Sequence, residues 1–163
     1  MTSDGRVDAL MDAIRRIVQA LRSSHRAAAY FNLTGAQLFV INALHDARRP
    51  LSVRELAART RTDPSTVSVV VTRLVKRGLV QRVRSADDNR RVELSLTRRG
   101  LALQRKAPTT LAQERLLDAL DNLSPRDPAT LQRLLTHIVN TMGAAEQPVE
   151  MLFDSPIARR ARR

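Results

Sequence analysis

The chain has 163 residues and a formal net charge of +12, which arises from 28 basic and 16 acidic residues. Cysteine is absent, which excludes disulfides, thiolate metal sites and redox sensing by cysteine. No apolar run approaches the ~18 residues of a membrane span and the N-terminal segment is acidic, so we expect a cytoplasmic protein without a membrane helix or signal peptide.

The first part of the chain predicts two helices. Apolar residues at three- and four-residue spacing predict a first helix over about residues 6–29. Thr34 and Gln37 fit the S/T-x-x-E/Q capping box, so a second helix is expected to start there. Pro50 closes the connection that follows.

Two shorter helical segments come next. Ser52 and Glu55 repeat the capping signal before a short third helix. Asp63 is suited to the N-cap of a fourth helix and Pro64 to its first position, while Gly78 is a stop signal. The two helices are therefore separated by only a short turn.

A basic, alternating segment follows the fourth helix. The stretches "LVQRV" and "RVELSLT" alternate apolar and polar residues, as the strands of a hairpin do. Residues 76–99 hold eight basic and three acidic residues, and a focused basic patch favours a polyanionic partner. The tip at Asp87, Asp88 and Asn89 lacks the glycine and distal glutamate of a calcium loop. The expected fold class is mainly α with a small β-hairpin wing (α+β), built around a winged helix–turn–helix.

Helix returns after the hairpin. Leucines at helical spacing mark one helix near residues 111–120, with Pro108 expected as a kink near its start. Ser124-Pro125 is expected to open a last helix, which ends at Gly143. Residues 144–163 contain two prolines and a basic end, and they predict a mobile tail.

From about Val7 to Gly143 the chain resembles the MarR (multiple antibiotic resistance regulator) family of transcription factors. The resemblance rests on "LTGAQ", on "LSVRELAARTRTDPSTVSVVVTRLVKRGLVQR", and on the D-x-R motif Asp88-Asn89-Arg90 followed by "LSLTRRG". It implies one unit over residues 1–163. This unit would have helical dimerisation regions at 6–33 and 100–143, a DNA-binding region at 34–99 and the basic tail at 144–163.

The resemblance also implies partners and a function. The family's architecture is a homodimer whose two winged units bind a palindromic operator on double-stranded DNA, and repression is relieved by a small aromatic or anionic effector. No enzymatic activity, cofactor, metal or membrane partner is expected. Without cysteine the peroxide-sensing mechanism of the family is excluded, and without tryptophan a urate-type ligand is not expected.

Eight residues are candidates for DNA contact. Helix 63–77 is expected to enter the major groove, where short donors and an arginine can reach base edges and phosphates. At the wing tip Arg90 could enter the minor groove, with Asp88 fixing its pose. The alternatives are that the short donors only serve the helix start and that the tip is a solvated turn. The candidates are Ser65, Thr66, Ser68, Arg73, Arg84, Asp88, Arg90 and Arg91.

Residues for an effector are less well marked. The family's ligand cleft lies between the dimer helices and the winged unit, and His25, Tyr30, Phe31 and His45 could line it. The alternatives are that each histidine is structural or exposed, and that the two aromatic residues simply pack the junction. The dispersed glycines form no phosphate-binding loop, and no catalytic histidine motif is present.

The sequence therefore predicts a dimeric, sequence-specific transcriptional repressor. Two alternatives remain at this point: a non-specific architectural DNA-binding protein, and a winged helix that serves only protein–protein contacts. A footprint on the upstream DNA would be short and symmetric in the first case, diffuse in the second and missing in the third.

Overall fold

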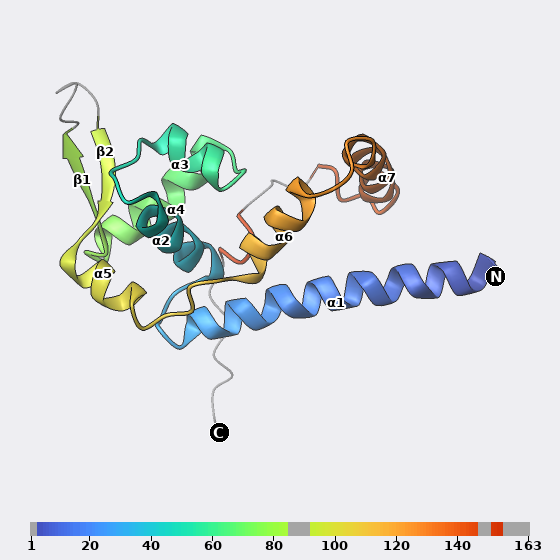
Figure 1. Cartoon of the computed structure of the whole chain (residues 1–163), viewed down its shortest axis with the longest axis horizontal. Coiled ribbons are helices and arrows are strands. Elements are labelled where there is room, and N and C mark those ends of the chain that lie inside the picture. The colour runs from blue at the N-terminus through green and yellow to red at the C-terminus, as the bar shows by residue number, and fades with distance from the viewer. Residues whose placement is uncertain (1–2, 85–91, 147–150, 155–163) are drawn as a thin grey trace.

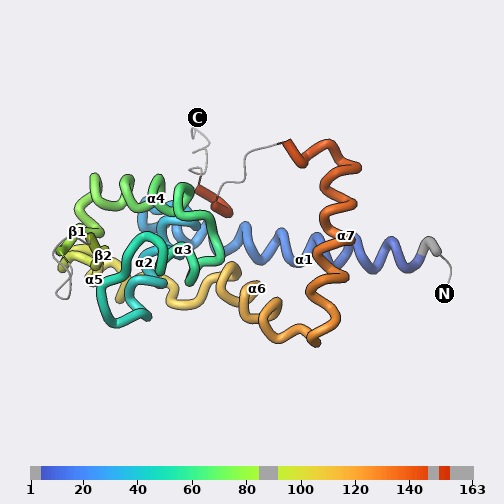
Figure 2. The backbone as a smooth tube through the Cα atoms, turned by 90° about the horizontal axis from the view of Figure 1, so that it is seen from above, coloured from blue at the N-terminus to red at the C-terminus, as the bar shows by residue number. Residues whose placement is uncertain are grey.

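The computed structural model describes residues 3–84, 92–146 and 151–154 (Figure 1). A small head of helices and a hairpin lies at one end, α1 and α6 extend away from it, and α7 follows α6 and runs across the direction of α1 (Figures 1 and 2). The elements in chain order are α1 (Ser3–Ala29), α2 (Gly35–Ala47), α3 (Val53–Arg59), α4 (Pro64–Lys76), β1 (Val80–Arg84), β2 (Val92–Leu96), α5 (Arg98–Gln104), α6 (Ala112–Asp121) and α7 (Asp127–Thr141). The expected mainly helical fold with a hairpin wing is confirmed.

The predicted helix starts are present with their caps. The Thr34 hydroxyl accepts from the Gln37 N–H at 3.1 Å, and the Thr34 N–H donates to Gln37 Oε1 at 3.2 Å. Ser52 and Glu55 form the same reciprocal pair at the start of α3. The Asp63 carboxylate accepts from the backbone of the first turn of α4. These side chains satisfy N–H groups that have no partner within the helix, and so they fix where each helix begins.

The core of the winged unit is organised around α2 and α4. Every residue of α2 from Gly35 to Leu44 is buried. On α4 the four residues predicted to face the core are fully buried: Val67, Val70, Val71 and Leu74. The antiparallel hairpin pairs Val80 with Leu96, and a bridge from Leu51 to Leu94 joins it to the segment before α3.

The expectation that Pro108 kinks a helix is wrong. Pro108 lies in the connection between α5 and α6, and α6 begins only at Ala112. The buried Asn42 amide donates to the carbonyls of Pro108 and Thr109 at 3.1 and 3.2 Å. These carbonyls are thus directed at α2, and proline supplies no N–H to continue a helix.

The last helix begins at Asp127, later than the expected start at Ser124-Pro125. Ser124 instead forms a turn, because its carbonyl accepts from the Asp127 N–H at 2.9 Å. None of the residues of α7 is buried within the chain. Large apolar side chains are exposed along α1 and α7: Val7, Leu10, Met11, Ile14, Ile17, Val18, Leu134, Leu135, Ile138 and Val139.

Exposed stripes of this length on both long helices need a partner surface. Within the described residues, no helix is both long and apolar enough to cross a membrane.

Gly100 permits a close approach between α5 and the residue before β1. A Cβ atom at this position would lie 2.1 Å from the Leu79 carbonyl oxygen, so backbone would have to move. We expect Gly100→Ala to lower the free energy of unfolding by about 3 kcal/mol, the upper part of the usual range for overpacking. Gly78→Ala is the control: its φ of +67° is strained but its surroundings are open, so about 1 kcal/mol is expected. Urea unfolding measures both, and equal losses would contradict the steric account.

The capping box of α3 should make stability depend on pH. Hydrogen bonds from the Ser52 hydroxyl and N–H, with a further bond from Arg49, lower the pKa of Glu55 from 4.5 to about 2. Because the folded-state pKa is depressed, the contribution is present above 4.5 and is lost as the pH falls toward 2.

Wild type should exceed Glu55→Gln in unfolding free energy by about 1 kcal/mol near neutral pH, a value reduced for the partial exposure of the side chain. This difference should vanish near the lowered pKa. A difference that stays constant across a series of urea titrations would contradict the assignment.

Candidate nucleic-acid interface

The outward face of α4 carries a short stripe of polar, apolar and basic side chains. Because Val67, Val70, Val71 and Leu74 face the core, helical geometry places Ser65, Val69, Thr72 and Lys76 on the opposite side. Val69, at the centre of this face, is 48% exposed. Thymine methyl groups in the major groove are natural partners for such a side chain.

Three of these positions were missed by the prediction from sequence. Val69, Thr72 and Lys76 follow Ser65 at the spacing of one helix face, so the periodicity that marked the core also marks its opposite side. The apolar character of Val69 concealed this, since valine in an amphipathic helix is usually assigned to the core.

The short donors predicted on α4 divide between two environments. Ser65 is exposed, and both its hydroxyl and its N–H donate to the Asp63 carboxylate. These bonds lower the pKa of Asp63. Ser68 is half-buried beside the outward stripe, whereas Thr66 lines a cavity on the flank of the helix. Ser65 therefore serves the helix start, which was the alternative to a DNA contact, while its exposed oxygen still faces outward.

Arg73 lies on the same flank as Thr66 and is paired with an acidic side chain from the end of the chain. Its Nη1 lies 2.6 Å from Asp154 Oδ2. The expectation of a mobile tail from residue 144 onward is thus wrong for residues 151–154, here called the C-terminal segment. Met151 and Asp154 are buried, and Figure 2 shows the segment, in red, beside α4. An apolar side chain and an aromatic ring give this stretch surface to bury, which the surrounding polar sequence does not suggest.

The wing places further positive charge next to α4. Arg82 and Arg84 are exposed on β1, and Arg84 pairs with Val92 at the last described position of the hairpin. Asp88, Arg90 and Arg91 lie outside the described residues, so their roles at the wing tip stay predictions.

His25 has a structural environment. Its ring is buried, and Nδ1 accepts from the Gly35 N–H at 3.0 Å. The ring stacks on Phe153 with centroids 5.0 Å apart and planes inclined by 21°. Burial lowers the pKa of His25, which favours the neutral ring that this acceptor role requires.

The other effector candidates do not join His25 in one cluster. Tyr30 is 93% exposed, and Phe31 is half-buried against the core of the winged unit. His45 is exposed in the last turn of α2, about 15 Å along the helix axis from the end that His25 contacts. Tyr30 is therefore largely in solvent, and of these two aromatic residues only Phe31 packs against the winged unit.

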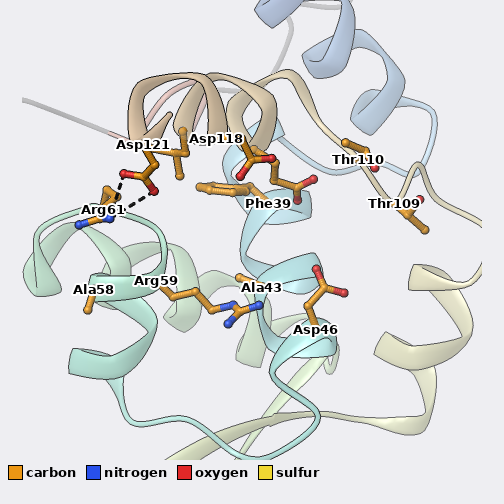
Figure 3. Close-up of a pocket in the computed structure, with 12 residues that line it drawn as sticks. Phe39, Ala43, Asp46, Ala58, Arg59, Arg61, Thr109, Thr110, Asp118 and Asp121 are labelled. Atoms are coloured by element: carbon orange, nitrogen blue, oxygen red, sulfur yellow. Dashed lines mark hydrogen bonds and ion pairs between the residues drawn. The ribbon is translucent and has the colours of Figure 1, made fainter. Parts of the chain in front are cut away.

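A cleft between α2, α3 and α6 has a volume of about 450 Å³ (Figure 3). Arg61 reaches across it from the turn after α3 and lies 3.1 Å from Asp121. Burial raises the pKa of Glu114, although the Leu111 N–H and the Asn42 amide both donate to it. The charged lining residues are Asp46, Arg59, Arg61, Glu114, Asp118 and Asp121, so the cleft is acidic in a strongly basic chain.

A second cavity of about 300 Å³ lies between α6, the start of α4 and the C-terminal segment. Five of its lining residues are apolar: Phe39, Leu116, Leu117, Met151 and Leu152. The polar lining residues include Gln113, which is 4% exposed, and neither its Oε1 nor its Nε2 has a hydrogen-bond partner among the described residues. A buried amide without partners is costly, and it can be satisfied by a polar group that enters the cavity.

Comparisons of the sequence with known proteins find similarity to transcriptional regulators. Residues 31–91 match the model of the MarR family. The HTH-type transcriptional repressor MdtR of Bacillus subtilis (strain 168) is 34% identical over 98 residues, which are 57% of this chain and 63% of MdtR. The chain thus spans less than two thirds of that relative.

Two solved structures share the fold. MarR from E. coli in its apo form has a TM-score of 0.54 and 25% identity, with 80% of this chain and 96% of that chain covered. A mutant MarR from E. coli complexed with operator DNA has a TM-score of 0.56 and 24% identity, with 85% and 99% covered.

Proposed function

We propose that this winged-helix chain is a member of the MarR family and that it regulates transcription in the cytoplasm by binding specific double-stranded DNA as a homodimer. The observation that carries the proposal is the outward stripe of α4, which combines short polar donors, an exposed Val69 and Lys76 on one helix face. The operator complex of the structurally similar mutant MarR supports the same use of the fold.

In this proposal some residues of the interface contact base edges and others contact DNA phosphates. Ser65, Ser68 and Thr72 can donate to base edges in the major groove, and the Val69 methyl groups can contact thymine. Lys76 and Arg84 can neutralise phosphates, which fixes the register on the duplex and releases counterions. Arg90 remains the candidate for the minor groove beyond the described part of the wing.

The apolar stripes of α1 and α7 are the proposed dimer surface. A second copy would cover both stripes, and it would place two reading helices about one turn of DNA apart, at roughly 34–36 Å. Such a dimer reads a palindromic operator. Repression is the proposed outcome, in line with the description of MdtR as a repressor.

The cavity at Gln113 is the proposed effector site. It would take a small aromatic molecule with one polar or anionic group, because five apolar side chains line the cavity and the unpaired Gln113 amide needs a hydrogen-bonding partner. Asp63 and Thr66 at the start of α4 also line it, so an occupant would alter how the reading helix is held against α6. His25 and His45 are left to structural and surface roles in this proposal.

Footprinting on the DNA upstream of the coding region tests the function. A short symmetric footprint supports a sequence-specific dimer. A diffuse footprint would favour an architectural DNA-binding protein, and no footprint would favour a winged helix used for protein contacts. Titration with salicylate-like compounds, followed by loss of the footprint, tests the effector.

Two α4 variants separate base reading from phosphate contact. We expect Val69→Ala to weaken operator binding roughly fivefold, or about 1 kcal/mol, with little effect on random DNA. Lys76→Ala should weaken binding to both DNAs alike and flatten the salt dependence. Fluorescence anisotropy with operator and random duplexes at several salt concentrations measures this. If Val69→Ala weakened both DNAs equally, the residue would not read sequence.

Charged substitutions within the apolar stripe of α7 test the proposed dimer surface. The double variant Leu134→Asp/Ile138→Asp should be monomeric and lose operator binding, because two carboxylates cannot be buried between helices without partners. Asn140→Asp adds a carboxylate on another face of α7 and should remain dimeric. Sedimentation velocity gives the mass of each, and a dimeric double variant would place the interface elsewhere.

A further inference from the structure

The C-terminal segment is bound to the winged unit through its backbone as well as its side chains. The Phe153 carbonyl accepts from the Ala36 N–H, in the first turn of α2, at 3.4 Å. A Cβ atom added at Gly35 would lie 3.1 Å from Phe153 Cβ, so the glycine leaves room for this close approach. Met151 adds a buried apolar side chain, which is 5% exposed. The segment therefore occupies a defined site.

The ion pair at the end of the segment joins a buried group to an exposed one. The Asp154 side chain is 9% exposed, whereas the Arg73 side chain is 50% exposed. Asp154 Oδ1 has no hydrogen-bond partner among the described residues, so Oδ2 and its bond to Arg73 hold the carboxylate. A buried carboxylate that loses its cation is strongly destabilised. The docked segment therefore depends on Arg73.

Arg73 also borders the stripe that faces DNA. It lies one helical turn after Val69 and directly follows Thr72, and half of its side chain is accessible. A DNA phosphate that approached this guanidinium would also approach the Asp154 carboxylate, and the two anions repel each other. The ion pair of Arg73 with Asp154 and a contact of Arg73 with a DNA phosphate therefore weaken each other.

We propose that the C-terminal segment is an intramolecular ligand of the reading helix, which competes with DNA phosphate for Arg73 and weakens DNA binding while it is docked. The competition rests on the proposed function, since it needs α4 to face DNA. Because the segment is part of the same chain, its effective concentration is high, and a modest contact is enough to keep the site occupied. Met151 and Leu152 also form one wall of the cavity at Gln113, so release of the segment would open that cavity.

Asp154→Asn tests the competition, because it removes the charge and keeps the shape. We expect this variant to bind operator DNA more tightly than wild type at low salt, by roughly three- to tenfold for two protomers, because the arginine of each ion pair is half exposed to solvent. The gain should shrink as salt rises. Asp12→Asn is the matched control: it removes the same charge from an exposed pair with Arg15 on α1, and it should change affinity less than twofold.

A double-mutant cycle assigns the gain to Arg73. Asp154→Asn should have no effect on DNA affinity in the Arg73→Ala background. The inference is overturned if the gain persists without Arg73, if Asp12→Asn matches it, or if Asp154→Asn weakens binding. The last outcome would make Asp154 a residue that positions Arg73 for DNA.

Hydrogen exchange without DNA tests the docking itself. The Ala36 amide donates to Phe153, so its exchange should accelerate in Asp154→Asn and in Phe153→Ala. The Gln37 amide, which donates to the Thr34 hydroxyl, should be unchanged. If the exchange rate of the Ala36 amide is unchanged in both variants, the inference of a docked segment is overturned, while the proposed function is unaffected. If neither wild type nor any variant bound DNA while Ala36 exchange responded as expected, the proposed function would fail. The segment would then only stabilise the fold and would not compete with DNA.

Discussion

The structure depends on the first turn of α2, whose backbone is buried and whose N–H groups have no partners within the helix. Three separate parts of the chain satisfy them. His25 of α1 accepts from Gly35, the C-terminal segment accepts from Ala36, and Thr34 accepts from Gln37. The side chain of Arg77, at the end of α4, in turn donates to Gln37 and to the Asn32 carbonyl. A buried N–H without an acceptor costs about 1–3 kcal/mol, so each of these parts is held in place by the same turn.

This arrangement couples the end of α1 to the winged unit. α1 ends where α2 begins, and the neutral His25 ring is a hydrogen-bond acceptor that also supports Phe153. Any rotation of the winged unit on α1 must therefore break or lengthen bonds at this turn. On the other side of α2, Asn42 binds the connection before α6. The helix is thus tied at the start of its buried stretch to α1, which carries one of the apolar stripes, and near the end of that stretch to the connection that leads into α6.

Local chemistry made much of this fold predictable. The caps at Thr34, Ser52 and Asp63 depend on residues three positions apart or fewer, and the three core valines and one core leucine of α4 follow the helical period. The missed features depend on distant residues. Arg73 and Asp154 are 81 positions apart, and no periodicity connects them. Pro108 was misplaced because its partner, Asn42, lies on another helix. Tyr30 and His45 were grouped with His25 because the resemblance implied a ligand cleft near all three, whereas Tyr30 lies just after α1 and His45 lies in the last turn of α2.

The absence of buried residues on α7 has a consequence for how the protein is made. A helix of 15 residues is marginally stable alone in water, and none of the described residues of its own chain buries its apolar side. If a second copy supplies that surface, the last step of folding is bimolecular, and its rate rises with the amount of protein already synthesised. The first few chains in a cell would then keep an exposed apolar helix that proteases can reach. A minimum level of synthesis would be needed before regulation by this protein begins.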